Sequence, residues 1–331
     1  MDYGEDDETE YEYKIIWQAR LLKSKIFDRL SFSFFLHNHN MLFSAGNASQ
    51  PREDLLMAVI TISREMGTGA YQIADEVAKK LKYTLVDGTR ISACASKFGL
   101  GPDMLQMVDE KPPSYITAED RKRAAALNSV ELILLDFARK GNVILYGRGG
   151  QDLLRDCGHV LRLRFIADFE ERVERFAERE WIDPDLARSM IRRSDHQRGG
   201  FIHFYYDRNW DDPLGYDLTF NTSRLSSASI VESIVAAAKD TLLKDAEKGT
   251  AEIIDNTILM KKIETALLNS SDLDYRPFKI VVDKGMVLLR GYLASEEEKK
   301  CALKIVESVK GVKSVEADIQ VVNYKAYKDK S

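Results

Sequence analysis

The sequence predicts an α/β fold, in which helices cover both faces of a parallel sheet, followed by a small α+β domain. Two observations lead to this prediction. Between residues 57 and 244, short apolar runs alternate with segments of helical periodicity, as strands and helices do in parallel α/β proteins. After residue 255 the pattern changes to a helix, two strands around a tight turn at Lys284 and Gly285, a second helix and a last strand.

Composition sets the class of protein. The chain has 331 residues, of which 44% are hydrophobic and 31% are charged, as in a soluble globular protein with two domains. The net charge of -5 gives no support to a nucleic-acid binder, which usually carries a basic field. The three cysteines are far apart and lack metal-ligand spacing, which fits a reducing compartment. With no apolar run long enough to span a membrane and an acidic start unlike a secretory signal, we expect a cytoplasmic protein.

Residues 1–56 differ from the rest, and we expect a poorly ordered extension. An acidic head precedes "KIIWQARLLKSKIFDRLSFSFFL", whose apolar residues recur at three- and four-residue steps among lysines and arginines. A helix lying on a membrane surface is the alternative. Translation from Met41 or Met57 is another, since the strand pattern begins only there.

The first domain is expected over residues 57–244 and a charged linker over 245–254. Five apolar runs predict parallel strands at 57–62, 83–87, 142–147, 160–167 and 216–222. Helical spacing predicts helices at 71–82, 118–140, 169–181, 184 to about 197, and 226–243. Gly141 is a plausible stop for the second of these helices.

The stretch "VITISREMGTGAYQIADEVAKKL" reads as a strand, a glycine-bearing turn and a helix, which is how phosphate-binding loops are built. The usual motif G-x-x-x-x-G-K-[ST] fails, because Ala70 stands in the lysine position and Arg64 in that of the first glycine. Gly67 and Gly69 still allow backbone N–H groups to converge on a phosphate at the helix start, where Arg64 and Thr68 add a charge and a hydroxyl. A turn without any ligand is the alternative.

Four motifs in order resemble the cytidylate kinase-like family of nucleoside monophosphate kinases. "ISREMGTGA" is identical to the family's I-S-R-E-[YF]-G-S-G-G at six of nine positions, and this branch characteristically lacks the lysine. The segments "YTLVDGTRI", "GNVILYGRGGQDLLRD" and "DRNWDDPLGYDLTFNTSRLS" are similar to the next three motifs. The resemblance covers about residues 57–243 and implies a P-loop kinase-like sheet with a helical lid.

The resemblance also implies residue roles. Arg148 matches the arginine of a G-R-D motif that meets the acceptor phosphate, although Gly149 replaces the aspartate. The implied donor-phosphate residues are Ser63, Arg64, Gly67, Thr68, Gly69 and Ala70, the implied acceptor residues are Asp87, Arg148, Asp195 and Arg198, and the implied catalytic residues are Arg64, Arg148, Arg175 and Arg179. For Asp87 a helix N-cap is equally compatible. For Arg175 and Arg179, in the charged run "RVERFAERE", the alternative is a solvated helix with internal salt bridges.

We therefore expect ATP-dependent phosphoryl transfer to a nucleoside monophosphate, with Mg²⁺ held through nucleotide phosphates rather than by direct protein ligands. Two alternatives stay open. One is a nucleotide-binding regulator with weak or lost activity, which signals through the C-terminal domain. The other is a structural adaptor in which neither site works.

Residues 255–323 resemble a BON domain, and 324–331 form a tail. Gly291 corresponds to the family's strand-ending glycine, and Gly311, Val312 and Val315 correspond to its G-V-x-x-V. The resemblance implies binding to a phospholipid surface or a protein partner, and hence a cytoplasmic protein able to attach at the membrane periphery. A packing or oligomerisation module is the alternative.

Overall fold

The structure is a computed structural model that describes residues 58–108, 110, 118–270, 273 and 278–322. The predicted N-terminal extension, with its alternative helix and starts, and the C-terminal tail lie outside these residues. Among the described helices, none is long and apolar enough to cross a membrane.

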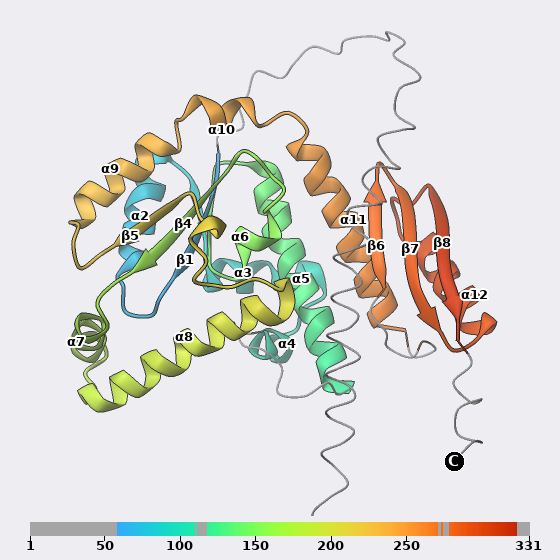
Figure 1. The fold of residues 1–331 in the computed structure, drawn as a ribbon, viewed down its shortest axis with the longest axis horizontal. Helices are drawn as coiled ribbons and strands as arrows, with labels where there is room; N and C mark the ends of the chain where they lie inside the picture. The colour runs from blue at the N-terminus through green and yellow to red at the C-terminus, as the bar shows by residue number, and fades with distance from the viewer. Residues whose placement is uncertain (1–57, 109, 111–117, 271–272, 274–277, 323–331) are drawn as a thin grey trace, which may run out of the picture. The chain divides into compact units, whose positions relative to one another are not determined.

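The first domain is built on a five-stranded sheet, in which every neighbouring pair is parallel (Figure 1). The strand order is β2-β3-β1-β4-β5. The strands are β1 (Val59–Arg64), β2 (Thr84–Val86), β3 (Val143–Tyr146), β4 (Val160–Ile166) and β5 (Leu218–Asn221). The predicted parallel α/β fold is confirmed.

Helices cover both faces because the strands are apolar on both sides. Ile60 and Ile62 of β1 point into one core together with residues of two helices, whereas Val59 points into a second core on the opposite face. The helices of this domain are α2 (Ala70–Leu81), α3 (Gly88–Cys94), α4 (Pro102–Met107), α5 (Ala118–Lys140), α6 (Gly150–Leu153), α7 (Phe169–Glu180), α8 (Pro184–Tyr206), α9 (Ser227–Ala237) and α10 (Thr241–Asp245), with 3-10 turns η1 (Ala95–Phe98) and η2 (Pro213–Gly215). Helices α2 and α9 pack with Ile60, and α5 packs with Val59.

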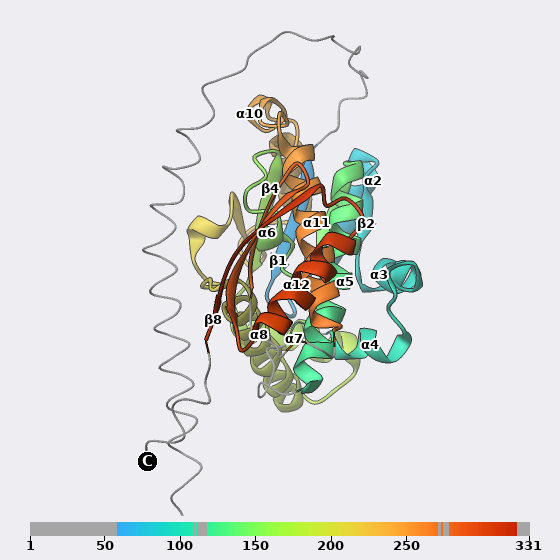
Figure 2. The same cartoon turned by 90° about the vertical axis from the view of Figure 1, so that its right-hand side faces the viewer.

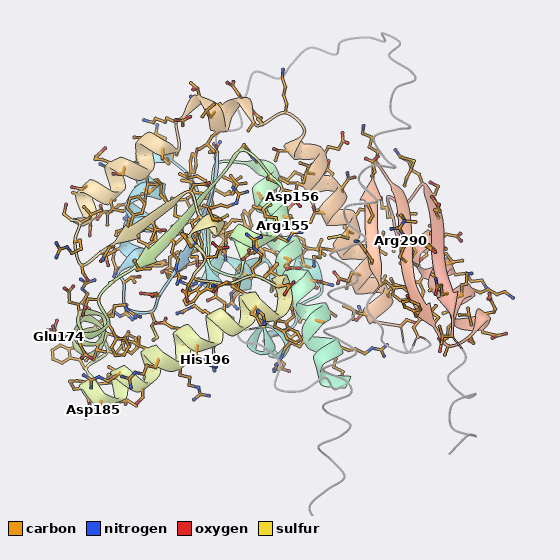
Figure 3. The ribbon with its side chains drawn as sticks, in the orientation of Figure 1. Arg155, Asp156, Glu174, Asp185, His196 and Arg290 are labelled. Atoms are coloured by element: carbon orange, nitrogen blue, oxygen red, sulfur yellow. The ribbon has the colours of Figure 1, made fainter. Side chains whose placement is uncertain are left out.

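Helices α7 and α8 form a pair with a small core of their own, marked in Figure 3 by Glu174 and Asp185. The predicted end of α8 near residue 197 is wrong, because the helix runs on through Gly199 and Gly200 to Tyr206. The reason is tertiary: Phe201 and Ile202 are buried in the large core beside α5, and this burial offsets the poor helix propensity of the two glycines.

The single helix predicted over 226–243 is divided into α9 and α10. The turn between them contains Asp240, whose side chain accepts a hydrogen bond from the amide of Leu242 and so begins a new helix. The sequence analysis assigned no elements between residues 88 and 117, where the structure has α3, η1 and α4.

The C-terminal domain has a three-stranded sheet of order β6-β7-β8. Its elements are α11 (Thr250–Leu268), β6 (Lys279–Asp283), β7 (Met286–Leu293), α12 (Glu296–Ser308) and β8 (Ser314–Val321). Strands β6 and β7 pair antiparallel, as predicted, and β8 pairs parallel to β7. Figure 2 shows α11 and α12 side by side, and both pack on one face of this sheet.

Helix α11 begins at Thr250, inside the segment expected to be a linker. Ile254 near its start is buried in the large core with α5, whereas Ile263 further along is buried in the C-terminal core. The predicted linker over residues 245–254 is therefore wrong in its second half. One helix contributes to both hydrophobic cores.

A buried charge pair fastens α11 to α5. The carboxylate of Glu131, whose side chain is 2% exposed, lies 2.8 Å from the ammonium of Lys261. It also accepts a hydrogen bond of 2.7 Å from the hydroxyl of Tyr206, at the end of α8. Glu131 therefore joins three helices at one carboxylate.

Replacing Lys261 by Met should destabilise the protein, because Glu131 would keep a buried charge without its cation. We expect the free energy of unfolding to fall by about 3 kcal/mol, measured by urea denaturation. The matched control is Lys262→Met, next in sequence and exposed, which should change stability by less than about 0.5 kcal/mol. Equal effects of the two variants would contradict a stabilising role for the pair.

Candidate functional site

The candidate site lies at the edge of the sheet where the parallel strands end. Strands β1 and β4 are neighbours, but the chain leaves them in opposite directions, toward β2 and toward β5. Ligands of open parallel sheets bind at such a switch point. The segment after β1, residues 65–69, is called the glycine loop below.

The glycine loop leads straight into helix α2. Gly67 and Gly69 have φ of 85° and 75°, in the left-handed region that favours glycine. Gly69 is the N-cap of α2, and among the described residues no side chain caps this helix start. The first amides of α2 and its positive dipole end are therefore available to an anion. Ala70, in the usual lysine position, is buried.

The charged side chains of Asp195 and Arg172 bind the backbone of the glycine loop. Asp195 of α8 accepts a hydrogen bond of 2.9 Å from the amide of Met66 and pairs with Arg172 of α7 at 2.5 Å. Arg172 in turn donates to the carbonyl oxygen of Met66 at 3.1 Å. Glu65 of the loop also pairs with Arg172, at 3.4 Å, so the loop, α7 and α8 are fixed to one another at Met66 and Glu65.

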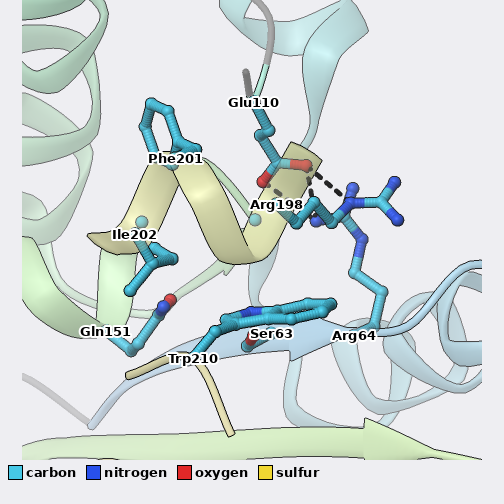
Figure 4. Close-up of a pocket in the computed structure, with 10 residues that line it drawn as sticks. Ser63, Arg64, Glu110, Gln151, Arg198, Phe201, Ile202 and Trp210 are labelled. Atoms are coloured by element: carbon cyan, nitrogen blue, oxygen red, sulfur yellow. Dashed lines mark hydrogen bonds and ion pairs between the residues drawn. The ribbon is translucent and has the colours of Figure 1, made fainter. Parts of the chain in front are cut away.

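Three arginines meet at one carboxylate beside the loop, and Figure 4 shows two of them, Arg64 and Arg198, at Glu110. Glu110 accepts hydrogen bonds of 3.0 Å from Nη1 of Arg64 at both of its oxygens, and one of 3.0 Å from Nε of Arg198. The backbone amide of Arg148 donates to the same carboxylate at 2.5 Å. The Arg64 guanidinium also stacks 4.6 Å from the ring of Tyr146.

The backbone after β3 is shaped for this meeting. Gly147, Arg148 and Gly149 all have positive φ, which turns the amide of Arg148 toward Glu110. A Cβ on Gly147 would lie 2.4 Å from Nη1 of Arg64, and a Cβ on Gly149 would lie 2.6 Å from the ring of Tyr206. Gly149 stands where the family motif has aspartate, and the ring of Tyr206 occupies the space that a side chain at this position would need.

Electrostatics keeps the cluster ionised. Burial alone opposes the charge on Glu110, but Arg64, Arg198 and Arg148 outweigh it and hold the pKa of this carboxyl well below its usual range. Burial likewise opposes the charge on Arg64, yet the neighbouring Glu110 carboxylate raises its pKa above the ordinary value. Both groups stay charged over any working pH.

Two cavities of ligand size lie at this part of the domain, one beside the glycine loop and one lined by Arg148 of the cluster. The first, of about 450 Å³, adjoins the glycine loop, and Arg175, Arg179 and Thr222 help to line it. The second, of about 530 Å³, is lined by α3, η1 and α4 residues and by Arg148. A cavity of about 180 Å³ shares the glycine loop and Arg179 with the first cavity, and Arg64 and Arg198 with the cluster. Small-molecule sites usually have such volumes.

Not every predicted site residue lines one of the two larger cavities. Ser63 is buried beside the cavity of about 10 Å³, and its hydroxyl accepts hydrogen bonds from Trp210 at 2.9 Å and from Arg164 at 3.1 Å. Asp87 caps α3 by accepting from the amide of Arg90, which is the alternative considered for it, and it also accepts from the hydroxyl of Tyr71 at 3.0 Å. Its role as an acceptor residue stays a prediction.

The lid arginines are partly tied to neighbours. Arg175 donates to Thr222 at 3.2 Å and pairs with Glu171 at 2.6 Å, while Arg179 pairs with Glu180. The hydroxyl of Thr222 also donates to the carbonyl oxygen of Thr68. The hydroxyl of Thr68 donates in turn to the carbonyl oxygen of Glu65. His196, which has no pattern typical of a nucleophile or metal ligand, lies exposed on α8 (Figure 3).

The sequence did not indicate that Glu110 belongs to the site, nor that Arg172 binds the glycine loop. Glu110 stands outside every motif, and nothing local marks it, because its partners lie 38 to 88 residues away in the sequence. The ion pair between Asp195 and Arg172 could not be predicted from their spacing in the sequence either, because the two residues lie on different helices, α8 and α7. Among the described residues, no group of three or more His, Cys, Asp and Glu side chains is placed to hold a metal ion.

Comparison with known proteins decides the family. The family model described as the cytidylate kinase-like family matches residues 59–224. The chain belongs to the cytidylate kinase-like family. The cytidylate kinase of Methanocaldococcus jannaschii is 30% identical over 190 residues, which are 56% of this chain and 99% of that one. The cytidylate kinase of Thermoplasma acidophilum is 25% identical over 56% of this chain and 95% of its own length.

This cytidylate kinase-like chain also carries a BON domain, whose family model matches residues 255–323. A solved structure of an uncharacterized protein from Eubacterium ventriosum is similar at 20% identity, with a TM-score of 0.45, over 55% of this chain and 98% of that one. Both resemblances inferred from the motifs are thus confirmed.

Two glycines of the same loop should respond differently to alanine. A Cβ on Gly67 would lie 2.8 Å from the carbonyl oxygen of Arg172, whereas a Cβ on Gly69 meets nothing within 4 Å. Gly69→Ala should cost only the left-handed strain, about 1 kcal/mol. Gly67→Ala should cost about 2 to 4 kcal/mol, since the loop must also move away from α7. Chemical denaturation of both variants measures the difference, and equal losses would contradict close packing of the loop on α7.

Proposed function

We propose that the protein transfers a phosphoryl group from ATP to a nucleoside monophosphate. The observation that carries the proposal is the convergence of Arg64, Arg148 and Arg198 at the sheet edge, near a cavity beside the glycine loop and a second cavity that Arg148 lines. Phosphoryl transfer requires a donor and an acceptor held in line, with positive charge around the moving group. Two separate cavities and nearby arginines support this proposal.

The donor is assigned to the cavity of about 450 Å³. The amides at the start of α2 would bind its phosphates, and Thr68, Gly69 and Arg175 line the same space. Mg²⁺ would arrive with the phosphates of the nucleotide and neutralise part of their charge. The residues fit this role because they offer main-chain donors and arginines to phosphate rather than a cage of carboxylates.

The acceptor is assigned to the cavity of about 530 Å³. Its lining is mostly apolar, with Ile91, Leu105 and Val130 among the residues, which suits the flat surface of a base. Arg148 lines this cavity and belongs to the arginine cluster, so it would direct the acceptor phosphate toward the donor. Asp195 would act by positioning the glycine loop and Arg198.

In this proposal, the positive charge that a phosphate-loop lysine would provide comes instead from arginines of the cluster at Glu110. Arg64 stands at the end of β1, and its guanidinium is held by Glu110 and Tyr146. A guanidinium can donate two hydrogen bonds to one phosphate, so Arg64 and Arg198 can stabilise charge on the group in transit. Closure of α7 and α8 over both cavities would exclude water.

Arg64→Ala should lower kcat/KM for transfer by about 10² to 10³, because a donor of charge to the moving phosphoryl group is lost. The assay measures ADP formed from Mg-ATP with CMP, dCMP, UMP or AMP, after a thermal shift has shown which nucleotides bind. The control is Arg155→Ala, because Arg155 is exposed just after α6 and its one ion pair among the described residues is with Asp156 (Figure 3). It should leave kcat/KM unchanged.

Stabilisation by nucleotides without product from any acceptor would contradict transfer. It would favour the alternative of a nucleotide-binding regulator. No effect of any nucleotide on thermal stability would contradict both readings.

We propose in addition that the BON domain binds a phospholipid surface or a protein partner with the face of its sheet that α11 and α12 leave uncovered. Val281, Met286 and Tyr292 are each more than 40% exposed on that face, beside Arg290 (Figure 3). Exposed apolar residues in one area often mark interaction surfaces.

Co-sedimentation of the full chain with anionic and neutral vesicles tests the membrane reading. We expect binding to anionic vesicles that is weakened several-fold by Tyr292→Ser. Leu242→Ser, also exposed but on α10, is the control. Absence of binding to either vesicle would leave the protein partner as the ligand of this face.

A further inference from the structure

The groups that bind the carboxylate of Glu110 are of the kinds that bind phosphate in proteins. A carboxylate and a phosphate monoester present oxygens to guanidinium groups in the same forked geometry. Glu110 is held by the same kinds of donor, since Nη1 of Arg64 lies 3.0 Å from both of its oxygens and Nε of Arg198 donates to one of them. It also takes the amide of Arg148, a backbone donor of the kind that binds phosphate.

Glu110 brings a single negative charge to Arg64 and Arg198, where a phosphate monoester would bring two. Asp195, which lies 3.6 Å from Arg198, is paired with Arg172 at 2.5 Å. A dianionic phosphate in place of the carboxylate would therefore bind the two guanidinium groups more strongly.

A buried hydrogen-bond donor in the cluster also supports an anion at this position. Nη1 of Arg198 is buried, and among the described residues it donates no hydrogen bond. Buried donors without partners are rare in folded proteins and call for a ligand or another explanation. The cavity beside it, which Glu110 helps to line, has a volume of only about 10 Å³, enough for about one water molecule.

We propose that Glu110 is a resident competitor for the acceptor phosphate, so that the enzyme at rest holds its own carboxylate in the acceptor subsite. This inference rests on the proposed function. The acceptor rather than the donor is the displaced ligand, because Arg148, whose amide binds the Glu110 carboxylate, lines the cavity assigned to the acceptor and not the cavity assigned to the donor. Binding of acceptor then requires the Glu110 side chain to leave the arginines.

The competition has a consequence for selectivity. A ligand with a weakly charged or absent phosphate cannot displace the carboxylate, because the arginines would lose one anion without gaining another. A phosphate monoester with two charges can. The resident carboxylate therefore raises the requirement for a dianionic acceptor and protects the arginines from mutual repulsion while the site is empty.

Glu110→Gln tests the proposal without any nucleotide. Inorganic phosphate at 10 times its dissociation constant should raise the Tm of the variant by about 3 °C, whereas the wild-type protein should shift by less than about 1 °C at the same concentration. The variant should also be less stable than wild type in phosphate-free buffer and recover when phosphate is added. Glu110→Ala, which removes the obstructing side chain as well, serves if the glutamine variant folds poorly.

Two further variants locate the effect. Glu110→Gln combined with Arg198→Met should lose the gained response to phosphate, because the buried donor is gone. Glu170→Gln is the matched control, since Glu170 pairs with Arg188 at 2.6 Å on the surface of the lid helices, and it should respond like wild type. A folded Glu110→Gln protein with no greater response to phosphate than wild type would overturn the proposal and leave Glu110 as a structural partner of the arginines.

Steady-state kinetics separates this inference from the proposed function. With transfer present, Glu110→Gln should lower KM for the acceptor about tenfold and leave KM for ATP unchanged. A lower KM for ATP instead would place the carboxylate in the donor's position and overturn the assignment to the acceptor. A phosphate response without any transfer would support the anion subsite and refute the kinase activity. Transfer without a phosphate response or a change in acceptor KM would do the reverse.

Discussion

The structure of the site depends on neutralising guanidinium groups that one parallel sheet brings to its edge. Arg64 ends β1, Arg148 follows β3, and Arg198 reaches the same point from α8. Such groups repel one another when they are taken out of water, so they can be held together only around an anion. Glu110 supplies that anion. The contact joins β1 to α8, and it lies beside the left-handed turn after β3 and the small cavity that Trp210 lines.

The glycine loop is built on the same principle with different partners. Asp195 neutralises Arg172, and both groups use their remaining hydrogen bonds on the two sides of Met66. The loop therefore keeps a fixed shape without a lysine, and Gly67, Thr68 and Gly69 line the cavity of about 450 Å³ together with Thr222. Positive charge is thereby distributed around the site in arginines of α7, α8 and β1, rather than concentrated in one mobile side chain of the loop.

The C-terminal domain is joined to the kinase-like domain by a shared helix rather than by a free linker. Helix α11 contributes Ile254 to one core and Ile263 to the other, and Lys261 on the same helix pairs with the buried Glu131. Because Glu131 also holds Tyr206 at the end of α8, the helix that carries Asp195 and Arg198 has its far end fixed at this junction. A physical connection thus runs from the BON domain to the helix that carries part of the cluster.

The sequence by itself determined the fold class, the two domains and the place of the glycine loop. These are local properties: the alternation of apolar runs with helical periods, two glycines between a strand and a helix, and motifs of consecutive residues. It also determined which arginines stand near the sheet edge, since Arg64 and Arg148 directly adjoin strand ends.

Only the tertiary structure decided what those residues touch. Glu110 lies among the arginines, α8 continues through two glycines, and α11 begins in a charged segment, because in each case a distant part of the chain supplies the partner. The physical reason is that burial and ion pairing act between segments brought together by the sheet topology. A pattern along the chain reports which face of an element is apolar, but not which side chain will meet it there.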